Sequence, residues 1–101
     1  MQELWHLTVS PRHLVVFEAA ARHGSFTRAA AELNVQQPAV SMAIRELETA
    51  LGLRLFDRQH RRITLTAAGT RLATDTSRAL EQILASARAV RQFGRGDHVT
   101  L

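Results

Sequence analysis

The 101-residue sequence contains no cysteine, no lysine and no tyrosine. The lack of cysteine excludes a disulfide framework and a thiolate metal site. The five histidines do not have the spacing of a zinc-binding helix, so we expect no metal ion and no cofactor in this chain. No apolar run approaches the ~18 residues of a membrane span, and the first residues lack the order of a signal peptide. We therefore expect a cytoplasmic protein that does not enter a membrane.

Catalytic patterns are lacking as well. The sequence has no glycine-rich phosphate loop and no pair of carboxylates placed for acid–base chemistry. Ser41 is the best isolated nucleophile, but no general base lies near it in the sequence. These absences argue against an enzyme.

Arginine supplies all thirteen basic residues of the chain, whose net charge is +4. Residues 54–62 hold four of these arginines and a single acid, Asp57, so most of the net charge falls in one short segment. The four are Arg54, Arg58, Arg61 and Arg62. This segment is the electropositive part of the chain, and its charge suits phosphate.

Apolar periodicity predicts helices at residues 11–23, 26–33 and 37–51, after a lead-in of residues 1–9 that has no period. Ser10 and Ser25 can cap the first two helices, and Asn34 tolerates the left-handed conformation of a tight turn. Beyond Gly52 the pattern alternates in "LRLFDR" and "RRITLT". This alternation predicts a two-stranded hairpin with its turn at Gln59-His60 and arginine at its tip.

The helix expected at residues 37–51 has two different faces. Its apolar ridge consists of Val40, Ile44, Leu47 and Leu51, at steps of three or four residues. On the other side, Gln37, Ser41 and Arg45 recur every fourth residue, with Pro38 and Met42 beside them. Glutamine can pair with adenine through a donor and an acceptor, and serine with several base edges. The polar face therefore suits a nucleic-acid groove.

The element before this helix supports the same interpretation. The small Ala29 and Ala30, the turn residue Asn34, and Val40 in the next helix have the spacing of a helix-turn-helix. A basic hairpin directly after it, residues 54–65, makes a winged variant. We expect a mostly α fold, with three helices and a hairpin wing in residues 10–65 and a long linker or dimerisation helix in residues 66–93.

Four blocks of the sequence resemble the amino-terminal domain of the LysR-type transcriptional regulators. They are "GSFTRAA", "QPAVS", "LE..LG..LF.R" and "LT.AG", and the resemblance runs from about Leu14 to Leu72. It implies a winged helix-turn-helix that regulates transcription, with residues 37–51 in the major groove and the wing, residues 54–65, at the backbone or minor groove. It also implies a larger carboxyl-terminal domain that senses a small-molecule effector, and residues 94–101 would begin the linker to it.

The resemblance also implies individual DNA contacts. Gln37, Pro38 and Ser41 of "QPAVS" would contact bases and phosphates, Thr27 and Arg28 would hold the backbone, and Arg58 matches the wing arginine. Gln36 replaces the usual serine or threonine, which alters the helix cap, and Met42 and Ala43 replace a polar or basic pair. The candidate DNA-binding residues are Thr27, Arg28, Gln36, Gln37, Pro38, Ser41, Met42, Arg45, Arg58, Arg61 and Arg62.

The last helix is expected to pair with a second copy of itself. Twenty-eight residues from Thr66 to Phe93 would span about 42 Å, whereas a domain of ~65 residues is about 28 Å across. Its apolar stripe would therefore project beyond the domain. The candidate interface residues are Leu72, Thr76, Ala79, Leu80, Ile83, Leu84, Ala87 and Val90. A homodimer predicts an interrupted palindromic site on double-stranded DNA, and a tetramer of the full-length protein stays open.

A second function remains as an alternative. The same winged fold can be a protein interaction module that has only generic DNA affinity. The arginine-tipped hairpin and the polar start of the helix at 37–51 argue against it, because protein-binding faces are richer in exposed aromatic side chains.

Overall fold

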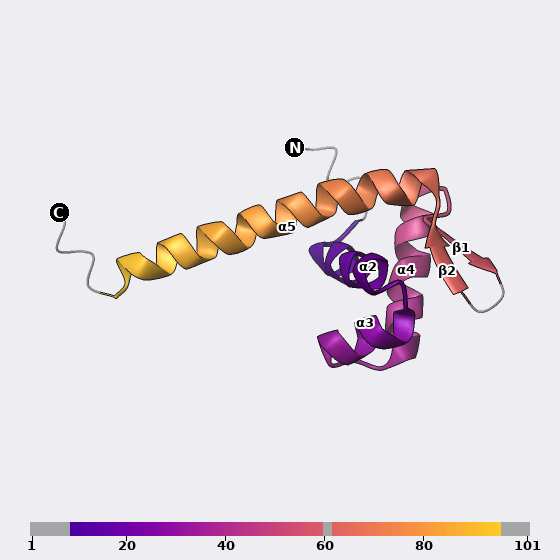
Figure 1. Cartoon of the computed structure of the whole chain (residues 1–101), viewed down its shortest axis with the longest axis horizontal. Helices are drawn as coiled ribbons and strands as arrows, with labels where there is room; N and C mark the ends of the chain where they lie inside the picture. The colour runs from indigo at the N-terminus through magenta and orange to yellow at the C-terminus, as the bar shows by residue number, and fades with distance from the viewer. Residues whose placement is uncertain (1–8, 60–61, 96–101) are drawn as a thin grey trace.

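The computed structural model describes residues 9–59 and 62–95 of the chain (Figure 1). The elements in chain order are α2 (Pro11–His23), α3 (Phe26–Leu33), α4 (Gln37–Leu51), β1 (Phe56–Gln59), β2 (Arg62–Leu65) and α5 (Ala67–Phe93). Figure 1 shows α2, α3, α4 and the hairpin gathered at one end of α5, whose other end projects away from them. This arrangement confirms the expected winged helix-turn-helix followed by a long helix.

The predicted caps set the helix boundaries. The Ser10 hydroxyl accepts a hydrogen bond from the backbone of His13 at 3.3 Å, and the Ser10 backbone donates to the His13 ring at 3.3 Å. The Ser25 hydroxyl accepts from the Arg28 backbone at 3.1 Å. Asn34 has φ 59°, the left-handed conformation that joins α3 to α4 through a tight turn. These local interactions satisfy backbone groups that helix ends leave without partners.

The core lies where α2, α3 and α4 meet the first residues of the wing. Its largest fully buried side chains are Phe17, Phe56, Ile44, Leu47, Leu55 and Val40. The Phe56 ring lies 5.5 Å from the Phe17 ring and 5.5 Å from the Phe26 ring, measured between centroids. An isolated two-stranded hairpin has little stability of its own, so Phe56 and Leu55 attach the wing to the helices.

The hairpin differs from the prediction in its strand boundaries. β1 begins at Phe56 rather than at residue 53, and just before it the backbone N–H of Leu55 bonds to the Glu48 side chain. Gln59 was predicted to lie in the turn, but it pairs with Arg62 of β2 and belongs to β1. The predicted turn at Gln59-His60 is therefore wrong for Gln59. His60 and Arg61 lie outside the described residues. At the other end of the domain, Val9 packs against the core although it was assigned to the lead-in.

Two residues predicted for the dimer interface are instead used within the chain. α5 packs on α2 and β2 along its first turns. Thr76 is only 5% exposed, and Leu72 is half-buried against the chain's own core. Their placement in the interface is therefore corrected, because an apolar stripe does not distinguish contact with the core from contact with a partner. From residue 81 to residue 95 every side chain is exposed, so the predicted projection of α5 is confirmed.

An ion-pair cluster joins the end of α2 to α3. The guanidinium of Arg22 donates to Glu32 at 2.7 and 2.8 Å and to Glu18 at 2.9 and 3.0 Å, and the His23 ring lies 2.6 Å from Glu32. The hydrogen bonds from Arg22, followed by that from His23, lower the pKa of Glu32 from 4.5 to about 2.

Replacing Glu32 with glutamine should change the acid sensitivity of the fold. A carboxyl with a lowered pKa stabilises the folded state above pH 4.5, and that contribution is lost as the pH falls towards 2. Wild type should therefore be more stable than Glu32→Gln at neutral pH, and the difference should vanish near pH 2. Urea unfolding of both proteins across this range measures it. A constant difference would show that the ion pairs do not contribute.

Candidate nucleic-acid interface

The start of α4 presents polar side chains at the surface. Gln36 is the N-cap residue, but its side chain makes no capping hydrogen bond, as the altered cap predicts. Gln36, Gln37 and Pro38 are all exposed. The amide of Gln37 donates to the hydroxyl of Ser41 at 2.8 Å, which holds the two side chains together. The first turn of α4 can therefore offer an oriented amide to a base edge.

A groove of about 380 Å³ lies between this face of α4 and the wing. We call it the recognition groove; it is lined by Phe26, Gln37, Ser41, Arg45, Arg58, Arg62 and Ile63. Five of the predicted DNA-binding residues thus lie around one hollow, three of them from α4 and two from the wing. Three of the five are arginines, so the groove is electropositive and open to an extended anionic ligand.

Arg58 occupies the centre of this arrangement rather than the tip of the wing. Its guanidinium lies 5.5 Å from the centre of the Phe26 ring, in cation–π contact. It also lies 3.4 Å from the carboxylate of Glu48. These contacts hold Arg58 between α3, α4 and β1, with its side chain still 38% exposed.

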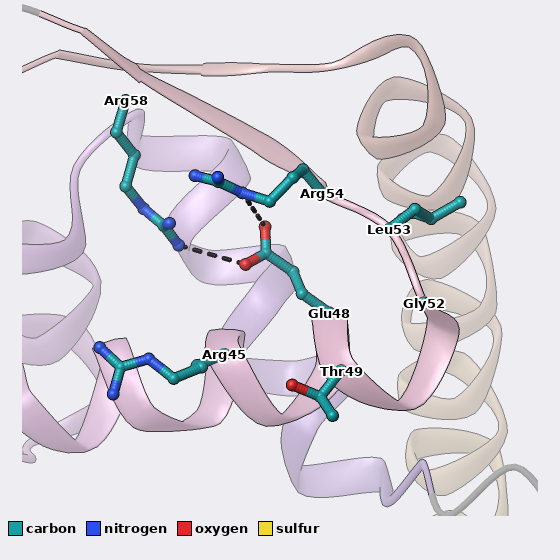
Figure 2. Close-up of a pocket in the computed structure, with 7 residues that line it drawn as sticks. All are labelled: Arg45, Glu48, Thr49, Gly52, Leu53, Arg54 and Arg58. Atoms are coloured by element: carbon teal, nitrogen blue, oxygen red, sulfur yellow. Dashed lines mark hydrogen bonds and ion pairs between the residues drawn. The ribbon is translucent and has the colours of Figure 1, made fainter.

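A second hollow of about 530 Å³ continues from the groove towards the base of the wing. Figure 2 shows the Glu48 carboxylate between the guanidinium groups of Arg54 and Arg58, with Arg45 on the same side and Leu53 directed away. The Nε atom of Arg54 is 3.8 Å from the carboxylate. We call this set of Arg45, Arg54 and Arg58 around Glu48 the arginine notch.

Glu48 was not among the residues chosen from the sequence. It is 8% exposed, and its carboxylate accepts hydrogen bonds from the backbone of Leu55 at 2.8 Å and of Phe56 at 3.3 Å. The position of Glu48 in the sequence could have indicated that its side chain needs partners. Glu48 lies four residues after Ile44, on the core side of α4, where an acid needs partners.

The remaining predicted residues lie at the edges of this surface. Thr27 and Arg28 are exposed in the first turn of α3. Met42 is 51% exposed and lines a separate hollow with the start of α2. Arg61 lies outside the described residues, so its predicted contact has no structural counterpart here.

The described part of the chain holds no group of three or more potential metal ligands. Among residues 9–59 and 62–95, no helix is both long and apolar enough to cross a membrane.

Two solved structures that resemble the chain closely contain DNA. The BenM DNA-binding domain in complex with catB site 1 DNA has a TM-score of 0.80 and 31% identity, over 86% of this chain and 97% of that one. The complex of the CbnR DNA-binding domain with DNA has a TM-score of 0.72 and 38% identity, over 82% of this chain and 95% of that one.

Curated proteins with similar sequences are named as regulators. The chain is 48% identical over 88 residues to the RuBisCO operon transcriptional regulator of Allochromatium vinosum, covering 81% of this chain and 29% of that protein. It is 47% identical over 72 residues to the regulator CfxR of Cupriavidus necator, covering 71% of this chain and 23% of that protein. The chain thus spans less than a third of the length of these relatives.

The family model described as "Bacterial regulatory helix-turn-helix protein, lysR family" matches residues 11–70. Those residues run from α2 through the wing to the first turn of α5, and they include the recognition groove and the arginine notch. The chain belongs to the lysR family of bacterial regulatory helix-turn-helix proteins.

Proposed function

We propose that this chain binds double-stranded DNA sequence-specifically as a homodimer and thereby regulates transcription. The observation that carries the proposal is the recognition groove, where the polar face of α4 and the arginines of the wing meet. An α-helix fits a major groove, and the first turn of α4 is polar, so α4 would enter that groove. The wing would then lie at the adjacent backbone or minor groove. The solved DNA complexes of BenM and CbnR, which share this fold, support DNA binding by this chain.

The proposed contacts divide into two kinds. Gln37, Pro38, Ser41 and the exposed Met42 would contact base edges, and Gln36 would make a further contact beside them. Arginines would supply attraction to the phosphates and the salt dependence that accompanies it, and those of the wing would also approach the minor groove, where they would read flanking base pairs. The arginine contacts come from Arg28, Arg45, Arg58, Arg61 and Arg62, with Thr27 as a further backbone contact. Arg54 is added to this set, because it lies in the arginine notch beside Arg45 and Arg58.

The proposed dimer rests on the exposed apolar side chains of α5. Ile83 is 61% exposed, Leu84 53% and Val90 65%, an arrangement that water disfavours. With Ala79, Leu80 and Ala87 they form one stripe, which a second α5 would cover. Two-fold pairing would space the two copies of α4 by the rigid pair of α5 helices, and an interrupted palindrome is the DNA site that matches this symmetry.

Since the curated relatives are more than three times as long as the aligned segment, the whole protein's partners are also proposals. We expect a carboxyl-terminal domain that binds a small-molecule effector.

Selection of bound sequences from random DNA, followed by titration of the best site at two salt concentrations, tests the proposed function. The expected result is an interrupted palindrome bound far more tightly than random DNA. Weak and unselective binding that depends strongly on salt would contradict it, and would favour a protein interaction module with generic DNA affinity.

Replacing Gln37 with alanine should flatten the preference at one base pair of each half-site. The loss of a paired donor and acceptor should weaken specific binding by about 1–3 kcal/mol and leave binding to random DNA nearly unchanged. Titration of both DNAs measures the two effects separately. An equal loss on both would show that Gln37 contacts the backbone instead of a base.

A further inference from the structure

The Glu48 carboxylate connects the recognition helix to the wing through four separate interactions. It accepts hydrogen bonds from the backbone of Leu55 at 2.8 Å and Phe56 at 3.3 Å. It also lies 3.4 Å from a guanidinium nitrogen of Arg58 and 3.8 Å from Nε of Arg54. All four partners belong to the base of the wing or to β1, whereas Glu48 itself belongs to α4.

A buried carboxylate of this kind holds its neighbours in a narrow range of positions. Removing a charge from water costs free energy that only well-placed partners offset, so the bonded geometry is strongly preferred over others. The wing cannot set its own orientation, because two strands without a further layer are only marginally stable. The polar bonds to Glu48 and the burial of Phe56 therefore both contribute to how the wing stands relative to α4.

We propose that Glu48 is a positioning residue for DNA recognition: without touching DNA, it fixes the wing and the side chain of Arg58 against the recognition helix. The inference rests on the proposed function, since it concerns how the two parts of one DNA-binding surface are held together. Its consequence is that bases beside the α4 contacts are read correctly only when the Glu48 carboxylate is present.

The direction in which DNA affinity changes when the charge of Glu48 is removed distinguishes a positioning role from a purely electrostatic one. Glu48 is an acid within a surface that attracts phosphate, so neutralising it should strengthen DNA binding if charge were its only role. Loss of a positioning residue should weaken binding instead, because the wing arginines would no longer meet the DNA in register. The two explanations therefore predict opposite changes in affinity.

Glu46→Gln provides a matched control for Glu48→Gln. Both changes remove one negative charge from α4 while keeping the side-chain shape. Glu46 is 55% exposed at its side chain and pairs with His13 at 2.9 Å, away from the wing. The dissociation constants of wild type and both variants would be measured on the selected site and on sites mutated at flanking or central positions.

We expect Glu46→Gln to bind as tightly as wild type or more tightly. We expect Glu48→Gln to bind roughly tenfold more weakly, about the effect of losing one good base contact. Its discrimination should be lost at the flanking positions and retained at the central ones read by α4. A purely structural loss of folded protein would lower all affinities equally and leave every preference unchanged.

The outcomes separate the inference from the proposed function. If wild type shows no selective DNA binding, the proposed function itself fails. If wild type is selective but Glu48→Gln binds like Glu46→Gln, with flanking preferences intact, the positioning role is overturned.

A measurement on wild type covers the case in which Glu48→Gln does not fold. The amide protons of Leu55 and Phe56 should resonate downfield and exchange slowly, in the free protein and in its DNA complex, because each bonds to a carboxylate. Fast exchange of both amides in the complex would mean that Glu48 does not hold the wing while DNA is bound, and would overturn the inference.

Discussion

Replacing Gly69 with alanine should cost about 3 kcal/mol of folding free energy or more, and lower the melting temperature by roughly 12 °C or more. A Cβ atom at this position would lie 2.1 Å from the backbone oxygen of Leu55 and 3.0 Å from the Leu65 side chain. The oxygen belongs to the backbone, so it can move only if the base of the wing moves with it. Thermal unfolding followed by circular dichroism measures the loss.

Gly94→Ala is the matched control, because it makes the same chemical change at the other end of α5. A Cβ atom there meets only the Arg91 oxygen at 3.6 Å, an ordinary contact, and Gly94 has φ −82°. Alanine generally favours the helical state over glycine, so this variant should be as stable as wild type or slightly more stable. Equal stability of Gly69→Ala and Gly94→Ala would mean that α5 does not approach Leu55 as closely as described.

Ile83→Asp should convert the proposed dimer to a monomer and reduce affinity for the palindromic site on the order of 100-fold or more. Ile83 is 61% exposed on the projecting half of α5, so the change has little to disturb within its own chain. In a two-fold helix pair the substitution would place two charges in one apolar contact. Sedimentation of wild type and variant, with DNA titration of each, measures both consequences.

Ala85→Asp controls for the added charge and for the lower helix propensity of aspartate. Ala85 is exposed and lies two residues further along α5, about 200° around the helix from Ile83 by helix geometry. This variant should remain dimeric and lose little affinity. A dimer that survives Ile83→Asp, or that dissociates equally in both variants, would remove the apolar stripe from the proposed interface.

The backbone of Leu55 is hydrogen-bonded both to α4 and to the cap of α5. Its N–H donates to Glu48 of α4 at 2.8 Å, and its carbonyl oxygen accepts from the backbone of Thr66, the cap of α5, at 2.9 Å. Gly69 packs directly on the same carbonyl group. α4, the wing and α5 are therefore connected through one short segment of backbone, so in the proposed dimer the separation of the two half-sites would depend on how that segment is held.

The sequence by itself determined the elements and the polar face of α4. Ser10, Ser25, Asn34 and Thr66 act within one or two turns of their own positions, so their capping and turn roles were readable without any tertiary contact. The spacing of the apolar residues likewise predicted α4 and the projecting part of α5, because steps of three and four residues are typical of an α-helix.

Only the tertiary structure decided which residues meet. Glu48 and Gly69 stood inside two recognised sequence blocks, yet their roles depend on Leu55, a residue of another element. The placement of Arg58 against Phe26 and Glu48 was hidden for the same reason. Thr76 fitted the apolar stripe, but it is buried against its own domain. Periodicity shows which residues share one side of a helix, and it does not show whether the same chain or a partner packs on that side. Local chemistry can be read from the order of residues, whereas long-range contacts depend on packing in three dimensions.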